Sequence, residues 1–263
     1  QTYVDTMNSA ATARFLELTH EKYRKHCKQR LGQSIRGIFT DEPHRGTLME
    51  RFAMPNPDPQ WTVPWTPRLL EEFQARFGYD LLNVLPELFL QLHGQAVSQV
   101  KWHFVELLQE LFIENFAIPY AQWCRDNDLI LTGHILHEDC LTAQTSMSGS
   151  VMRFYEQMDW PGIDILTEDN RAYWVAKQVQ SVARQLGRKW VLSELYACTG
   201  WQFDFKGHKA VGDWQALFGI NARCHHLSWY TMQGEAKRDY PASIFDQSAW
   251  WKEYSAIEQY FAR

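Results

Sequence analysis

Two glutamates directly follow short apolar runs, and their side chains have the chemistry of acid–base catalysis. Glu42 stands in Thr-Asp-Glu-Pro just after the predicted strand at 34–40, and Glu194 stands in Leu-Ser-Glu-Leu at the end of the predicted strand at 189–194. Two carboxyl groups that face one another across a pocket can cleave a glycosidic bond. One protonates the leaving oxygen, while the other attacks the anomeric carbon or activates a water molecule. Each glutamate could instead cap a helix or pair with an arginine, so this pairing is a prediction.

The densest group of ionisable side chains lies at residues 132–139, Thr-Gly-His-Ile-Leu-His-Glu-Asp. Its two histidines and two acids could bind a metal ion or orient a substrate hydroxyl. The spacing is not His-Glu-x-x-His, so zinc has weak support, whereas calcium prefers carboxylate and carbonyl oxygens. We predict Glu138 and Asp139 as metal ligands, and the later acids that are also compatible with calcium are Asp164, Glu168 and Asp169.

Glu138 carries a separate expectation about its surroundings. If it lies in the same mouth as Glu42 and Glu194, three carboxylates repel one another, and a bound cation or a held proton relieves the repulsion. We therefore expect Glu138 or Asp139 to lie near a metal, a histidine or an arginine rather than at the free surface. His134 is the first candidate partner.

Aromatic side chains are abundant, with 12 Trp, 11 Tyr and 15 Phe. They can fill a bulky core, or some of them can line a groove in which flat apolar rings stack on a ligand. Residues that follow predicted strands are the ones placed to reach such a groove. The predicted substrate contacts are Asp41, His134, Trp201, Trp229 and Tyr230.

Short apolar strands that alternate with helices must position these residues. The predicted strands lie at 34–40, 129–134, 163–166, 189–194 and 224–232. Helices are predicted at 66–78, at 98–124 with a bend at Pro119, at 171–186 and at 247–262. Continuous apolar strands separated by helices are typical of a parallel sheet with both faces covered, and its active site lies at the carboxyl ends of the strands.

The alternation of strands and helices predicts an α/β fold, namely the later part of a (β/α)8 TIM-type barrel. The chain supplies about five strand–helix units, so residues 1–263 form an incomplete catalytic barrel, and residues 44–128 form a helical insertion after the first strand. A barrel needs eight strands. We therefore expect further residues before Gln1, or a partner chain, to complete it.

Composition narrows the classes of function. The net charge is −5 with Lys and Arg scattered, which argues against a nucleic-acid ligand, and no apolar run reaches the roughly 18 residues of a membrane span. The five cysteines include no C-x-x-C pair, which favours free thiols and weakly favours a reducing compartment such as the cytoplasm.

A series of short motifs occurs in order along nearly the whole chain. They are FTDEP (39–43), PWT (64–66), FGYDL (77–81), LTGH (131–134), MDWPGID (158–164), LSELYACTGW (192–201) and KRDYP (237–241). Together they resemble the bacterial, alpha-L-rhamnosidase-like proteins of glycoside hydrolase family 106. The resemblance implies a (β/α)8 catalytic barrel, hydrolysis of a rhamnoside-like O-glycosidic bond with inversion, and a calcium ion near the site. It also implies a longer parent chain with β-sandwich domains elsewhere.

The assignment of roles stays open between two layouts. Asp-Glu-Pro after a strand also resembles the Asn-Glu-Pro of clan A retaining glycosidases, in which Glu42 would be the acid and Glu194 the nucleophile. Inverting chemistry would instead pair Glu42 with Glu138 across a water molecule. Carboxyl groups roughly 5–5.5 Å apart imply retention, and groups about 6.5–9.5 Å apart imply inversion.

Two other classes of function remain as alternatives. One is a non-catalytic carbohydrate-binding protein that keeps an aromatic groove without turnover. The other is a metal-dependent hydrolase built on the cluster from His134 to Asp139.

Overall fold

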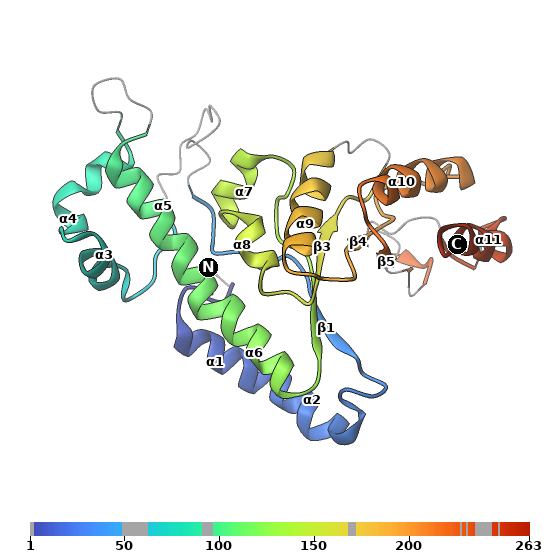
Figure 1. Ribbon diagram of the computed structural model, residues 1–263, viewed down its shortest axis with the longest axis horizontal. Coiled ribbons are helices and arrows are strands. Elements are labelled where there is room, and N and C mark those ends of the chain that lie inside the picture. Colours follow the sequence, from blue (N-terminus) through green and yellow to red (C-terminus); the bar gives the residue numbers. More distant parts are fainter. Residues whose placement is uncertain are drawn as a thin grey trace. The chain divides into compact units, whose positions relative to one another are not determined.

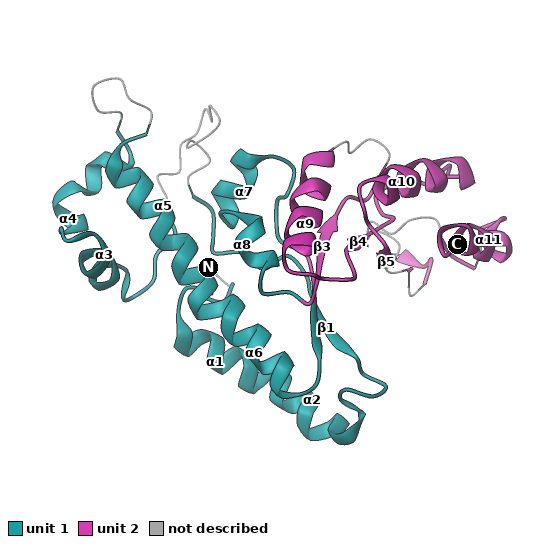
Figure 2. Cartoon of the chain, in the orientation of Figure 1, with its two compact units in different colours: residues 1–131, 135–158 teal, residues 132–134, 159–263 magenta. Residues whose placement is uncertain are grey.

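The computed structural model describes residues 3–48, 63–90, 97–167, 172–226, 228–229, 231–234, 244–246 and 248–263. The predicted contact Tyr230, the acids Glu168 and Asp169, and the KRDYP motif lie outside these residues. Within the described part of the chain, no helix is both long enough and apolar enough to cross a membrane. The chain divides into two compact units, which are unit 1 (residues 1–131 and 135–158) and unit 2 (residues 132–134 and 159–263) (Figure 2).

Five short strands form a sheet with the hydrogen-bonded order β1-β2-β3-β4-β5 (Figure 1). They are β1 (Gly37–Thr40), β2 (Ile130–Gly133), β3 (Trp160–Asp164), β4 (Leu192–Glu194) and β5 (Ala222–Cys224). The pairs β2–β3, β3–β4 and β4–β5 are parallel. A parallel five-stranded sheet whose strands alternate with helices confirms the predicted α/β class.

Two strands lie earlier in the chain than the sequence predicted. β3 begins at Trp160 and contains Pro161, a residue that a strand interior usually excludes. A Cβ at Gly162 would lie 2.5 Å from the carbonyl oxygen of Gly133, so β3 approaches β2 this closely because position 162 is glycine. β5 ends at Cys224, where the predicted strand begins, and Trp229 lies outside any strand. The aromatic composition after Cys224 therefore misled the prediction.

Unit 1 is helical around its strands. Before β1 lie α1 (Ser9–Leu18), α2 (His20–Cys27) and η1 (Lys28–Arg30). Between β1 and β2 the described chain holds α3 (Leu69–Phe77), α4 (Leu81–Val84), η2 (Leu85–Leu88), α5 (Gln99–Phe112), η3 (Ile113–Ala117) and α6 (Ile118–Asp126). After β2 lie α7 (Leu141–Met147) and α8 (Val151–Tyr155).

The long predicted helix at 98–124 is continuous but irregular before Pro119. The segment η3 is π-helical and lies between α5 and α6. Proline lacks the N–H that an α-helix would bond to the carbonyl four residues earlier, and its ring crowds that carbonyl. A widened π turn at this point accommodates the proline without breaking the helix.

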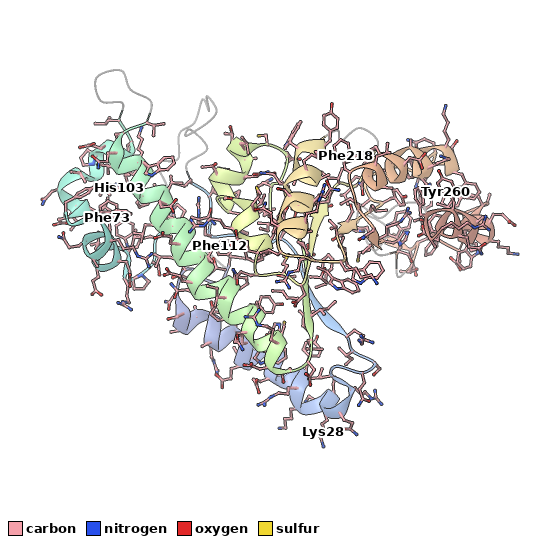
Figure 3. The ribbon with its side chains drawn as sticks, in the orientation of Figure 1. Lys28, Phe73, His103, Phe112, Phe218 and Tyr260 are labelled. Atoms are coloured by element: carbon pink, nitrogen blue, oxygen red, sulfur yellow. The ribbon has the colours of Figure 1, made fainter. Side chains whose placement is uncertain are left out.

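Aromatic rings form much of the core of unit 1, where they pack its helices against one another. Phe112 of α5, which is labelled in Figure 3, stacks on Phe154 of α8 with ring centroids 5.3 Å apart. Phe73 of α3 and His103 of α5 lie 6.5 Å apart in the same unit. Phe73, Phe112 and Phe154 are fully buried. These rings therefore fill the core, which is the first of the two uses expected for the abundant aromatic side chains.

Unit 2 contains three α-helices in addition to β3, β4 and β5. They are α9 (Tyr173–Gln185), α10 (Phe205–Leu217) and α11 (Tyr254–Phe261), the last preceded by η5 (Trp251–Glu253). In α9, Val175, Val179 and Val182 are buried, whereas Leu186 just after the helix is exposed. At α11, one oxygen of Glu258 accepts hydrogen bonds from Arg223 at 2.9 Å and from His225 at 2.9 Å.

His208 of α10 is a fully buried neutral histidine in unit 2. Its Nδ1 lies 2.7 Å from the carbonyl oxygen of Asp204, which can only accept, so Nδ1 carries the proton. Its Nε2 is buried and has no hydrogen-bond partner among the described residues. Burial, with the positive charge of Arg223 nearby, lowers the pKa of His208 to about 4.

We expect this histidine to make unit 2 acid-sensitive. The unfolded chain binds a proton at His208 below pH 6.5, while the folded chain does so only near pH 4. The contribution of His208 to stability is therefore fully present well above pH 6.5 and decreases as the pH falls from 6.5 toward 4, by at most about 1.4 kcal/mol per pH unit. Urea unfolding at a series of pH values measures this slope.

The variant His208→Gln should flatten the slope, while the exposed His26→Gln should leave it unchanged. Titration of the imidazole of the wild-type protein by NMR is an independent check. An imidazole of His208 that titrates near 6.5 would contradict the prediction.

Candidate active site

The loop after β1 carries the first candidate carboxylates, both in unit 1. Asp41 is exposed, and Glu42 is partly buried with a left-handed φ of 53°. Such a φ is uncommon for a non-glycine residue and costs conformational energy. Burial raises the pKa of the Tyr3 phenol, and the charges of Glu42 and Asp41 raise it further. Tyr3 therefore lies in the electrostatic field of both acids.

Glu138, also in unit 1, is buried at 4% exposure. The hydroxyl of Tyr155 on α8 donates to Glu138 Oε1 at 2.6 Å, and Gln144 of α7 donates to the Glu138 backbone carbonyl at 3.0 Å. Burial raises the pKa of the Tyr155 phenol well above its usual value, and the charge of Glu138 adds to this effect. Tyr155 therefore stays protonated and remains a donor, which stabilises the ionised carboxylate.

The neighbouring Asp139 lies in a different environment. Its side chain is 64% exposed and lies 4.0 Å from Nδ1 of the exposed His137. Among the described residues, neither Glu138 nor Asp139 belongs to a group of three potential ligands with donor atoms within 4.8 Å of one another. A metal at these two residues stays a prediction.

Unit 2 holds the second set of candidates, at the carboxyl ends of its strands. Asp164 of β3 is in register with Glu194 of β4, and Glu194 is in register with Cys224 of β5. Residues in register on neighbouring parallel strands point to the same face of the sheet, so these three side chains share one face. This is the edge at which α/β sheets carry their active sites.

His134 contacts Glu194 at this edge. Its Nε2 lies 2.6 Å from Oε2 of Glu194, and the side chains are 1% and 14% exposed. A carboxylate can only accept, so the imidazole donates in this hydrogen bond. The histidine predicted as the partner of Glu138 thus orients Glu194. His134 directly follows Gly133, the last residue of β2, so the end of β2 positions it for this contact with Glu194.

The two predicted tryptophans of unit 2 stack on one another. The rings of Trp201 and Trp229 are 4.7 Å apart and inclined by 19°. Trp201 is 54% exposed, while Phe245 contacts Trp229 edge-on at 5.8 Å. Trp201 thus offers an indole face to solution, backed by a second ring. A flat apolar face of this kind suits stacking on a sugar ring.

The structure thus brings some predicted residues together and adds others. His134 and Glu194 form a direct contact, as do Trp201 and Trp229. Tyr155, which donates to Glu138, was not among the predicted site residues. No local pattern marks this tyrosine, because it faces Glu138 only once α8 has packed beside α5 and η3.

Comparisons with known proteins give the arrangement its context. The chain is similar over 99% of its length to the solved rhamnosidase of Novosphingobium sp. PP1Y, with a TM-score of 0.74 and 22% identity. It spans 24% of that relative's chain. None of the curated proteins matches it in sequence. The family model described as alpha-L-rhamnosidase, glycoside hydrolase family 106, matches residues 2–263. The chain therefore belongs to glycoside hydrolase family 106, as its ordered motifs indicated.

Proposed function

We propose that the protein hydrolyses O-glycosidic bonds of α-L-rhamnosides. The observation that carries this proposal is the match of the alpha-L-rhamnosidase family model to residues 2–263. The strand-end carboxylates support it, because glycoside hydrolysis needs paired acids and the described chain supplies Glu42, Glu138 and Glu194 at or just beyond strand ends. The activity, substrate and partners are proposals for a chain that spans 24% of its solved relative.

The proposed reaction assigns one role to each carboxyl group. Glu42 is the general acid, whose proton passes to the glycosidic oxygen as the bond to the anomeric carbon breaks. Glu194 or Glu138 is the second carboxylate, which either attacks the anomeric carbon or takes a proton from the attacking water. His134 orients Glu194 through their 2.6 Å hydrogen bond. In the inverting course, the second carboxylate takes the proton that the attacking water loses. In the retaining course, a water molecule then cleaves the glycosyl-enzyme bond and gives its proton back to Glu42, so both carboxyl groups return to their starting states.

The proposed substrate contacts are Asp41, His134, Trp201, Trp229 and Tyr230. The support for Trp201 is its exposed, ring-backed indole face. Stacking of a sugar on such a face buries the apolar C–H groups of the sugar without consuming its hydroxyls. Asp41, as an exposed carboxylate beside the acid, suits a hydrogen bond from a substrate hydroxyl.

We also propose that the five strands are the later part of a (β/α)8 barrel. The strand order leaves β1 and β5 at the two ends of the sheet, and unpaired sheet edges need a partner. Further strands of a longer parent chain, or a partner chain, would pair with these edges. The coverage of 24% of the solved relative supports the first of these sources.

The full-length protein should release nitrophenol from nitrophenyl α-L-rhamnoside and leave the matched glucoside and galactoside intact. Absorbance measures the release, and calorimetry on rhamnose measures binding separately. Binding without any hydrolysis would favour the carbohydrate-binding alternative. Activity that a chelator abolishes and that zinc but not calcium restores would favour the metal-dependent hydrolase.

A further inference from the structure

Arg45 is a buried guanidinium that the reaction proposed above does not use. It lies three residues after Glu42 in unit 1 and is 5% exposed. Burial lowers the pKa of Arg45 to about 9. A buried cation is costly unless its N–H groups are satisfied. A charge held at this cost calls for a structural or functional reason.

Arg45 donates to carbonyl oxygens at the end of α7, and its Nη1 also donates to the carbonyl oxygen of the adjacent Gly46 at 3.4 Å. Nη2 donates to the carbonyl of Thr145 at 2.6 Å, and the backbone N–H of Arg45 donates to that of Met147 at 3.1 Å. The N–H of Leu48 donates to the carbonyl of Ser146 at 2.6 Å. The last carbonyls of a helix have no partner within it and carry partial negative charge, so a cation there is favourable. The segment 45–48 thus closes the end of α7.

The helix that Arg45 holds is tied to Glu138. α7 begins at Leu141, shortly after Glu138, and its Gln144 donates to the Glu138 backbone carbonyl at 3.0 Å. The other end of the connection is Glu42, which is separated from Arg45 only by Pro43 and His44. Pro43 restricts the backbone there, and the carbonyl of His44 accepts from the hydroxyl of Thr6 at 2.8 Å. The link from Glu42 through Arg45 and α7 to Glu138 is therefore stiff along its length.

We propose that Arg45 is a positioning residue, which holds Glu42 in place relative to Glu138 by fastening the segment after Glu42 to the C-terminal carbonyls of α7. This inference rests on the proposed function. Arg45 itself touches no substrate. Its loss lets the segment 42–48 shift against α7, so the acid no longer meets the leaving oxygen in the productive geometry.

The effect is expected to depend on the leaving group. Arg45→Lys and Arg45→Ala should lower kcat on an alkyl α-L-rhamnoside by about 10²-fold, the cost of misplacing a catalytic group by about 1 Å. The dinitrophenyl α-L-rhamnoside should lose far less, because its leaving group departs with little help from an acid. KM should change little on either substrate. Lysine keeps the charge but cannot reproduce the planar fork, so it does not rescue.

Two further measurements separate positioning from folding. The ratio of kcat on the two substrates is independent of how much of a variant is folded, so it remains informative if Arg45→Ala folds poorly. Added guanidinium ion should restore kcat of Arg45→Ala on the alkyl rhamnoside. The control is Arg68→Lys, whose side chain is 73% exposed in the same unit and which should alter neither rate.

Loss by the same factor on both substrates, or no loss on either, would overturn the inference while leaving the proposed function intact. A wild-type protein that cleaves neither substrate would instead overturn the proposed function, and this inference with it. A changed ratio of kcat on the two substrates, together with rescue by guanidinium ion, is the result that supports the positioning role of Arg45.

Discussion

Replacing Glu42 by glutamine is expected to lower kcat on an alkyl α-L-rhamnoside by about 10²–10⁴-fold, the usual cost of losing a positioned acid. The amide keeps the shape of the side chain and its hydrogen bonding but has no proton of suitable acidity to give. Steady-state kinetics with the full-length protein measures the loss. The activated dinitrophenyl substrate should be cleaved at a rate much closer to that of the wild type.

The pH profile gives the same variant a second readout. A general acid works only while it is protonated, so the wild-type kcat/KM falls as the pH rises through the pKa of Glu42. That alkaline limb should disappear in Glu42→Gln on the alkyl substrate, whose leaving group needs the acid. The matched control is Glu71→Gln, whose side chain is 75% exposed on α3 and which should change neither rate nor profile. Near-wild-type kcat of Glu42→Gln on the alkyl substrate would remove Glu42 from the role of acid.

The acids at the strand ends could be predicted from sequence because the signal for them is local. A short apolar run that stops at an acid defines both a strand and its end, and Glu194 is indeed the last residue of β4. Parallel pairing then places strand ends at one edge without further information. The bounds of β3 and β5 were wrong because Pro161 and the aromatic residues after Cys224 locally favour the opposite assignments.

The partners of the acids could not be predicted, because tertiary packing decides them. The repulsion argument predicts that Glu138 is not a surface acid, and the residue is buried. The hydroxyl of Tyr155 donates to Glu138, and the packing of Phe154 against Phe112 helps to place this tyrosine. The partner of a histidine that follows a strand likewise depends on how the strands pair. His134 follows β2, and its donor nitrogen meets Glu194 two strands away in the sheet order.

That contact leads to the second large effect, on Glu194. We expect Glu194→Gln to lower kcat by about 10²-fold or more, as for a base or nucleophile. His134→Gln should also lower kcat, but less, because the imidazole acts by holding the carboxylate in its 2.6 Å hydrogen bond. The double variant should be no slower than Glu194→Gln alone. Their coupling energy should then be about 1 to 3 kcal/mol, as for residues in direct contact.

The control cycle uses Lys209 and Asp213, an ion pair on the surface of α10 with side chains 49% and 39% exposed. Replacing Lys209, Asp213 or both should leave kcat unchanged. If the effects of His134→Gln and Glu194→Gln on kcat simply multiply, the two side chains act independently and His134 does not work through Glu194.

The anomer released first decides which role Glu194 fills. NMR of early product distinguishes retention, in which a carboxylate attacks the anomeric carbon, from inversion, in which it activates water. Under retention, Glu194→Gln should stop the reaction before any glycosyl-enzyme forms, and Glu138→Gln should be much less damaging. Under inversion with Glu138 as base, Glu138→Gln should be the slower variant. Because Glu138 is buried against Tyr155 while Glu194 is held by His134, each glutamine replacement disturbs a separate hydrogen bond, and the two variants can be compared directly.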